Sequence, residues 1–128
     1  QKHFKCWRYT EDLDTATKGL NDREPTEHYA IWVRDGQEAD EELKNLSANQ
    51  LKESSIPGIT LLEREVYELK YWNETGGHLD KENYTLCSGS RHSDGDVPRV
   101  SWYGGKMSVY WYSPRNAFDS LRSRAVVS

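Results

Sequence analysis

The chain has 128 residues, a length that suffices for one domain but not for two. Only 35% of the residues are hydrophobic, so the core must be small. The formal net charge is −4; the acidic excess lies in residues 1–86, and residues 87–128 carry a small basic excess. So small a basic excess excludes the basic stripe of a nucleic-acid-binding protein, and no apolar run approaches the roughly 20 residues that insert into a membrane.

The first half of the chain predicts two short strands and a broken helix. Residues 4–9 and 29–33 are aromatic and β-branched runs between polar stretches, which is typical of strands. Residues 40–51 place leucines among charges and predict a helix. We expect that helix to break near Ser47, because Ser47 and Gln50 have the spacing of a capping box.

A second helix has clear signals at both ends. Thr60 and Glu63 form another capping box, and Gly76 with Gly77 stops the helix. Its acidic side chains are expected to face solvent, as charged residues on helices usually do. Its apolar residues fall on one face at helical spacing: Leu62, Val66 and Leu69, with Trp72 one turn further on.

The remaining elements are strands. Residues 83–88 predict one strand, residues 97–112 predict a hairpin, and residues 125–127 close the chain. The order of strand, helix, helix and then several strands excludes a parallel sheet of alternating units. We therefore expect an α+β fold in which two helices pack on one side of a small antiparallel sheet, with the first and last strands paired.

The hairpin divides its side chains between two faces. Gly104 and Gly105 are typical of a two-residue turn, and with Tyr103 and Lys106 beside that turn, alternate side chains share a face. The expected cross-strand pairs are Trp102 with Met107, Val100 with Val109, and Pro98 with Trp111, which form an apolar inner face. The opposite side, here called the tyrosine face, carries Arg99, Ser101, Tyr103, Ser108, Tyr110 and Tyr112.

The side chains between residues 91 and 120 favour recognition. Tyr, Ser, Arg, Asn, Asp, Gly and His dominate this stretch, and antibody paratopes use a similar set because Tyr supplies rigid area while Ser, Gly and Asn adapt. A binding surface is one interpretation. The other is a solvated hairpin face, since tyrosine also suits strands.

The C-terminal third also resembles a known family. The residues that carry the resemblance are Leu86-Cys87-Ser88-Gly89-Ser90-Arg91, Asp94-Gly95-Asp96-Val97-Pro98, Trp102, Trp111 and Leu121-Arg122-Ser123-Arg124-Ala125-Val126-Val127. This region resembles C-type lectin-fold proteins of the formylglycine-generating type. It is most similar to the variable proteins of diversity-generating retroelements, the family of the phage major tropism determinant.

The resemblance implies a C-type lectin-like fold and a non-enzymatic, ligand-binding function. In that family, adenine positions of the gene are mutagenised, so variable sites carry residues reachable from Asn codons, whereas Trp codons contain no adenine. The implied scaffold is about residues 1–88 and the variable, ligand-binding region about residues 89–124 of a single domain. The implied location is a virion or cell surface, and the implied partner is a protein or glycan on another surface.

The predicted ligand-binding residues lie in the 91–96 segment, on the tyrosine face and in the 113–120 segment. They are Arg91, His92, Ser93, Asp94, Asp96, Arg99, Ser101, Tyr103, Ser108, Tyr110, Tyr112, Arg115, Asn116, Phe118 and Ser120.

The chain departs from the calcium-dependent lectins and from the formylglycine-generating enzymes. The Glu-Pro-Asn and Trp-Asn-Asp motifs that hold calcium and sugar are missing, as is a pair of reactive cysteines in the C-terminal half. We therefore expect no calcium, no cofactor and no catalysis. The alternative function is a calcium-independent carbohydrate-binding domain, or a small enzyme, that uses the same aromatic face.

Cysteine and histidine leave further alternatives. His3, Cys6, Cys87 and His92 have the donor types of a tetrahedral zinc site, but their spacing matches no common zinc finger and favours a buried free thiol with surface histidines. A disulfide between the two cysteines is open, because two cysteines allow one bridge without implying it.

Two pairs of charged residues have a structural and a functional interpretation. Asp94 and Asp96 flank Gly95 and either bind a cation or form a plain turn, which this sequence favours. Arg122 and Arg124 lie in the closing segment and either anchor ligand or pair with buried carbonyls and carboxylates, and the second role is favoured.

Overall fold

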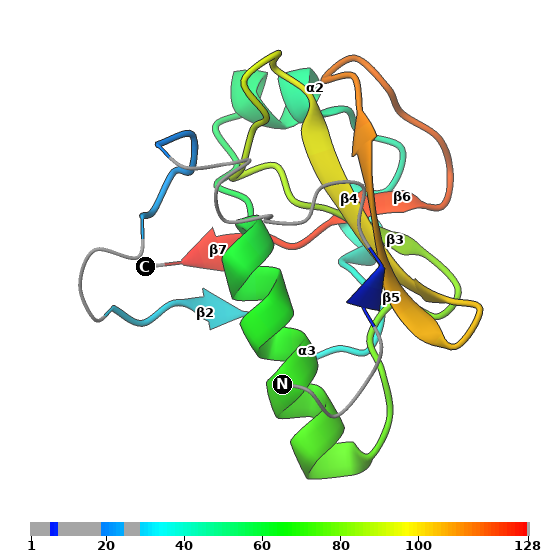
Figure 1. The fold of residues 1–128 in the computed structure, drawn as a ribbon. Helices are drawn as coiled ribbons and strands as arrows, with labels where there is room; N and C mark the ends of the chain where they lie inside the picture. Colours follow the sequence, from blue (N-terminus) through cyan, green and yellow to red (C-terminus); the bar gives the residue numbers. More distant parts are fainter. Residues whose placement is uncertain (1–5, 8–18, 25–28, 128) are drawn as a thin grey trace.

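The computed structural model describes residues 6–7, 19–24 and 29–127, and it is α+β (Figure 1). Its helical elements are the 3-10 helix η1 (Glu41–Leu43), helix α2 (Ala48–Glu53) and helix α3 (Leu61–Thr75). Its strands are β1 (Cys6–Trp7), β2 (Trp32–Val33), β3 (Tyr84–Leu86), β4 (Val97–Tyr103), β5 (Lys106–Tyr112), β6 (Leu121–Ser123) and β7 (Val126–Val127).

The strands form two sheets, of which the larger has the order β1-β5-β4-β3-β6 and the smaller pairs β2 with β7. The expectation of a purely antiparallel sheet is wrong, because β1 runs parallel to β5 and β3 runs parallel to β6. The expected pairing of the first and last strands is wrong too. The closing strand β7 pairs with β2, and β1 adds to the free edge of the hairpin.

The helix boundaries follow the predicted signals. The Ser47 hydroxyl accepts from the Gln50 amide at 3.1 Å, and the Thr60 hydroxyl accepts from the Glu63 amide at 3.2 Å, so both capping boxes are present. The helix expected over residues 40–51 is split into η1 and α2 at Ser47, and α3 ends where Gly76 takes a φ of 75°. Within the described residues no helix combines the length and apolarity needed to cross a bilayer.

Two apolar clusters cover the two sides of the larger sheet. Val100 of β4 belongs to the first cluster, and Val97, which points to the other side of the strand, belongs to the second. The first cluster consists of Ile59, Leu61, Cys87, Val100, Met107, Val109 and Val126. The second consists of Leu43, Ala48, Leu51, Leu86, Val97 and Leu121, so η1 and α2 cover part of the side that carries the tyrosine face. The expectation that both helices pack on one side of the sheet is therefore wrong, because α3 contributes Leu61 to the first cluster, on the other side. Figure 1 shows α3 with the larger sheet on one side and the β2–β7 pair on the other.

Helix α3 buries a different face from the one its apolar pattern predicts. Val66 is 56% exposed, and Leu62 and Leu69 are half-buried. Arg64 and Glu68 are instead fully buried against the rest of the molecule. A charged pair at the centre of the fold needs partners, and these come from outside the helix.

Those partners form a buried polar network. Arg64 Nη1 donates to Glu68 Oε1 at 2.8 Å, and Arg64 Nε donates to Asp80 Oδ2 at 3.1 Å. Arg124 Nη2 donates to Asp80 Oδ1 at 3.0 Å, and Thr85 of β3 both donates to Asp80 and accepts from Arg124. Burial alone would lower the pKa of Arg64, but the carboxylates of Asp80 and Glu68 outweigh it and raise that pKa. The network ties α3 to the sheet and to the end of the chain.

The expectation that helix carboxylates face solvent is therefore wrong for Glu63 and Glu68 of α3, whereas Glu74 of the same helix is exposed. Glu63 is 7% exposed and Glu68 is fully buried. Asp40, next to η1, is buried as well, and its Oδ2 accepts from the Ala125 amide at 2.9 Å. Each of these carboxylates has donors that replace the water it loses.

Candidate ligand-binding surface

The hairpin has the register predicted from the sequence. Val100 pairs with Val109 and Pro98 pairs with Trp111. Gly104 and Gly105 have φ values of 63° and 80°, which the primed two-residue turn requires. The division into an inner face and a tyrosine face therefore holds.

The inner face is apolar, as expected, but its two tryptophans are only half-buried. Val100 and Val109 have no exposed surface. Trp102 stacks on His78 with ring centroids 3.3 Å apart, and Trp111 meets His92 edge to face at 5.0 Å. Both tryptophans thus pack between the first apolar cluster and a histidine at its border.

The tyrosine face is only partly open to solvent. Tyr103, beside the turn, is 74% exposed. Ser101 and Ser108 face each other across the strands and are each only 3% exposed, so the prediction that they lie on an exposed contact surface is wrong. Both are short side chains between larger neighbours at alternate positions of the same strands, such as Arg99 and Tyr110.

The end of the tyrosine face away from the turn packs against the second apolar cluster. Tyr84, Tyr112 and Phe118 are half-buried there. Phe118 meets the rings of Tyr84 and Tyr112 edge to face, with centroids 5.8 Å apart in both pairs. The sequence predicted that this side of the sheet contacts only ligand. In the structure, packing within the protein holds these three rings in place there.

Arg99 lies at the centre of this aromatic group. Its guanidinium carbon is 4.0 Å from the ring centroid of Tyr84, 4.4 Å from that of Tyr110 and 4.9 Å from that of Tyr112. Among the described residues no carboxylate forms an ion pair with it, and its Nε is buried without a hydrogen-bond partner. Tyr84 is not among the predicted ligand-binding residues, because only the β3–β4 pairing brings it to Arg99.

The segment after β5 continues this surface. Arg115 and Asn116 are exposed, and the turn that presents them is closed by the Asn116 amide, which donates to the Ser113 carbonyl at 3.0 Å. Ser120 is half-buried, and its carbonyl accepts from the Tyr84 amide at 2.9 Å. Arg115 and Asn116 therefore lie at the same end of the hairpin as Tyr112, while Tyr103 lies at the other end.

Residues 91–96 form a separate loop before β4. Ser93 and Asp94 are exposed, whereas Arg91, His92 and Asp96 are half-buried. Asp94 Oδ1 accepts from the Asp96 amide at 2.9 Å, which is the plain turn that the sequence favoured. This loop contacts the inner face through His92, so the structure does not join it to the aromatic group around Arg99.

The structure also shows the surroundings of Cys87, Arg122 and Arg124. Cys87 is a free thiol with no exposed surface, and burial raises its pKa above the ordinary range. His3 and the Cys6 side chain lie outside the described residues, and the described part contains no group of three or more metal-ligating side chains. Arg122 and Arg124 have structural partners: Arg122 Nη1 donates to the Ala39 carbonyl at 3.0 Å.

Comparison of the chain with protein-family models, with curated proteins and with solved structures finds no match.

Proposed function

We propose that the chain is a non-enzymatic ligand-binding protein with a C-type lectin-like fold, a variable protein of a diversity-generating retroelement. Its ligand is a protein on another surface, and contact is made through the tyrosine face and residues 113–120. The observation that carries this proposal is Arg99, a cation that lies among three tyrosine rings and has no carboxylate partner in the described part of the chain.

Arg99 favours a ligand that carries an acidic group. A guanidinium above aromatic rings gains about 0.5–2 kcal/mol, but it keeps its charge and its planar set of donors. A carboxylate brought to such a site forms charge-assisted hydrogen bonds in surroundings drier than bulk water. Arg and Tyr are also the side chains on which protein interfaces most often depend.

The packing around Arg99 lowers the cost of binding. Tyr84 and Tyr112 are held by Phe118 and by the second apolar cluster before any ligand arrives. Side chains that are already ordered lose little rotamer entropy when a partner docks. Tyr103, Arg115 and Asn116 are exposed around this ordered centre and supply the replaceable part of the surface.

The alternative carbohydrate-binding function has weaker support from the same geometry. A sugar that stacks on tyrosine needs a free ring face, and the Arg99 guanidinium lies over the rings of Tyr84, Tyr110 and Tyr112. A sugar that stacks on the covered face of one of these three rings would have to displace the guanidinium, whereas an acidic protein side chain would not.

The gene tests the retroelement part of the proposal. Natural copies should differ at adenine-containing codons of exposed residues such as Tyr103, Arg115 and Asn116, and should match a nearby template repeat. The codons of buried Val109, Ser101 and Ser108 should stay constant. Differences spread evenly over the gene, with no template repeat, would refute this part.

Peptide selection tests the ligand class directly. Random peptides displayed on phage and selected on the purified protein should be enriched in Asp and Glu. The enriched peptides should bind less well to the Arg99→Gln and Tyr103→Ser variants. They should bind equally well to Trp32→Ser, a matched control because Trp32 is 76% exposed and Tyr103 is 74% exposed.

Peptides that bind all three variants alike, or that lack acidic residues, would contradict the proposed surface. If a glycan array gives binding that Arg99→Gln abolishes and no peptide is enriched, the carbohydrate-binding alternative is correct instead.

A further inference from the structure

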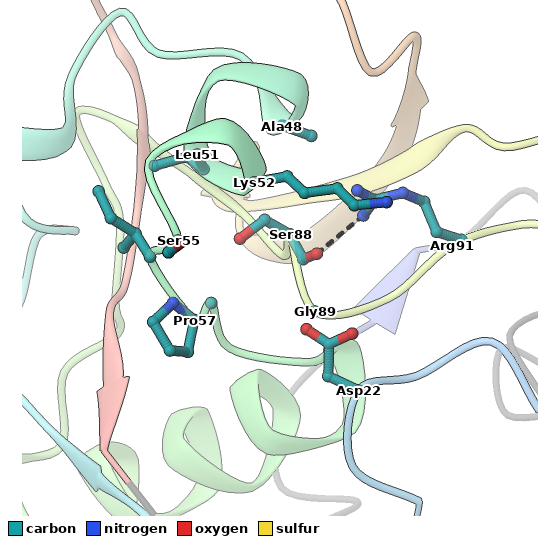
Figure 2. Close-up of a pocket in the computed structure, with 11 residues that line it drawn as sticks. Asp22, Ala48, Leu51, Lys52, Ser55, Pro57, Ser88, Gly89 and Arg91 are labelled. Carbon is teal, nitrogen blue, oxygen red and sulfur yellow. Dashed lines mark hydrogen bonds between the residues drawn. The ribbon is translucent and has the colours of Figure 1, made fainter.

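A pocket of about 430 Å³ lies apart from the tyrosine face, between α2, the segment that follows it and residues 88–91 (Figure 2). Such a volume is within the usual range for small-molecule sites. One wall is mostly apolar and is formed by Ala48, Leu51, Ile56 and Pro57. The opposite side carries Ser88, Gly89, Arg91 and Asp22.

Two cations, Lys52 and Arg91, line this pocket. In Figure 2 the Lys52 ammonium and the Arg91 guanidinium point toward one another. Within the described residues neither forms an ion pair. An anion in the pocket would be attracted by both charges.

Arg91 is anchored in a way that leaves two of its nitrogens available. Its Nη1 donates to the carbonyls of Ser88 at 2.8 Å and of Ser90 at 3.0 Å. Nε and Nη2 have no hydrogen-bond partner among the described residues, and together they form a side-on pair of donors that matches the two oxygens of a carboxylate or phosphate.

Asp22 does not cancel these charges. Its amide donates to the Gly89 carbonyl at 2.7 Å, but its carboxylate forms no ion pair in the described part of the chain. Burial lowers the pKa of Arg91, and the charge of Asp22 offsets this only in part. With Lys52 included, the pocket keeps a positive excess.

The backbone that supports Arg91 is closely packed. The Gly89 amide donates to the Ile59 carbonyl at 3.0 Å. A Cβ on Gly89 would lie 2.5 Å from the Gly58 carbonyl oxygen, and a Cβ on Gly58 would overlap the Ser88 hydroxyl. The segment that carries Arg91 is therefore held in place by the neighbouring segment of Gly58 and Ile59. Such a rigid support suits a binding site.

We propose that this pocket binds a small organic anion whose carboxylate or phosphate group lies between Lys52 Nζ and the Nε and Nη2 edge of Arg91. The body of the ligand packs mainly on Ile56 and Pro57, the accessible part of the apolar wall. This site is separate from the surface around Arg99 and does not depend on the function proposed for that surface.

The probes are phenyl phosphate and benzoate, with neutral benzyl alcohol as the control, titrated into the full chain and followed by NMR. We expect at least one anion to bind and benzyl alcohol to bind much more weakly. Lys52→Gln should weaken binding about tenfold, the usual effect of losing one charge-assisted contact. Lys81→Gln removes an exposed lysine outside the pocket and should leave binding unchanged.

Arg91→Lys keeps the charge but loses the paired donors, so it should weaken binding as well. If that variant does not fold, Lys52→Gln still decides, because Lys52 is exposed on α2. Binding of phenyl phosphate alone assigns a phosphate ligand, and binding of benzoate alone assigns a carboxylate.

The proposal is overturned if neither anion binds at millimolar concentration, if Lys52→Gln binds as well as the unmodified chain, or if benzyl alcohol binds as tightly as the anions. Tyr103→Ser should not affect these titrations, which separates this site from the tyrosine face.

Discussion

Glu63, at the start of α3, accepts hydrogen bonds from three residues. Arg23 Nε donates to it at 2.6 Å, the Tyr29 hydroxyl at 2.9 Å and the Thr60 amide at 2.9 Å. Burial raises the pKa of Glu63, but the bonds from Arg23, Thr60 and Tyr29 outweigh burial and the pKa is lowered. Burial and the bond to Glu63 raise the pKa of Tyr29 to about 12, so that hydroxyl remains a donor at neutral pH.

Glu63 should therefore make stability depend on pH in the acid range. A carboxylate whose pKa is lower in the folded state stabilises the fold above its unfolded pKa, about 4.3, and loses this effect as pH falls through the folded value. Glu63→Gln should be less stable by about 1–3 kcal/mol at pH 7, the cost of leaving buried donors poorly paired. The difference in unfolding free energy between Glu63→Gln and the unmodified chain, measured by urea denaturation, should be smaller at pH 4 than at pH 7 and smaller again at pH 3.

Glu53→Gln is the control, because Glu53 is exposed at the end of α2. If the Glu63→Gln difference is the same at all three pH values, the carboxylate of Glu63 does not carry the acid dependence.

Arg124 supplies a second test among the buried charges. Arg124→Met leaves Asp80 with one cation instead of two, and removing a partner from a buried ion pair usually costs about 3–5 kcal/mol. The variant should melt at a much lower temperature in differential scanning calorimetry. Arg115→Met, which changes an exposed arginine in the same way, should stay within about 0.5 kcal/mol of the unmodified chain. Equal melting temperatures for the two variants would mean that the network does not stabilise the fold.

At the scale of elements, the β4–β5 hairpin depends on its turn. Gly104 and Gly105 both have positive φ, and a Cβ at either position would meet nothing within 4 Å. The constraint is therefore the backbone conformation and not the space available. The same turn determines which side chains reach the tyrosine face, because a shift of one residue would exchange the two faces.

Gly105→Ala should destabilise the chain by about 1–2 kcal/mol, because a Cβ is strained in the left-handed region. Gly105→Asn should cost less, since asparagine tolerates that region. Urea denaturation of the two variants measures the difference, with Gly36→Ala as a control at a glycine whose φ is not positive. A larger loss for Asn than for Ala would argue against the turn geometry.

For the whole molecule, binding and stability should separate. Replacing Tyr103, Arg115 and Asn116 together by serine should leave the melting temperature nearly unchanged, because each exposed site contributes within about ±0.5 kcal/mol. Ile59→Ala, at a residue with no exposed surface in the first apolar cluster on the other side of the sheet, should cost about 2–5 kcal/mol. Acidic peptides selected on the unmodified chain should lose affinity for the triple variant and keep it for folded Ile59→Ala. A triple variant that unfolds would show that these side chains support the fold.

The amino-acid sequence alone is sufficient to predict the features that depend on a few neighbouring residues. The capping boxes at Ser47 and Thr60, the stop at Gly76 and the turn at Gly104 were all predicted, and so was the hairpin register. Each needs only hydrogen bonds or backbone angles within about four residues, so the local chemistry is sufficient.

Which elements meet is known only from the folded arrangement. Nothing local indicated that β7 pairs with β2, that α3 buries Arg64, or that Tyr84 comes to Arg99. Arg64 is buried because Asp80, 16 residues away, is there to neutralise it, and Asp80 is in turn paired with Arg124, 44 residues further on. The burial of a charge is strongly unfavourable unless an opposite charge lies beside it. A sequence pattern therefore predicts that a charged residue is exposed, because it does not show that a distant residue will be its partner.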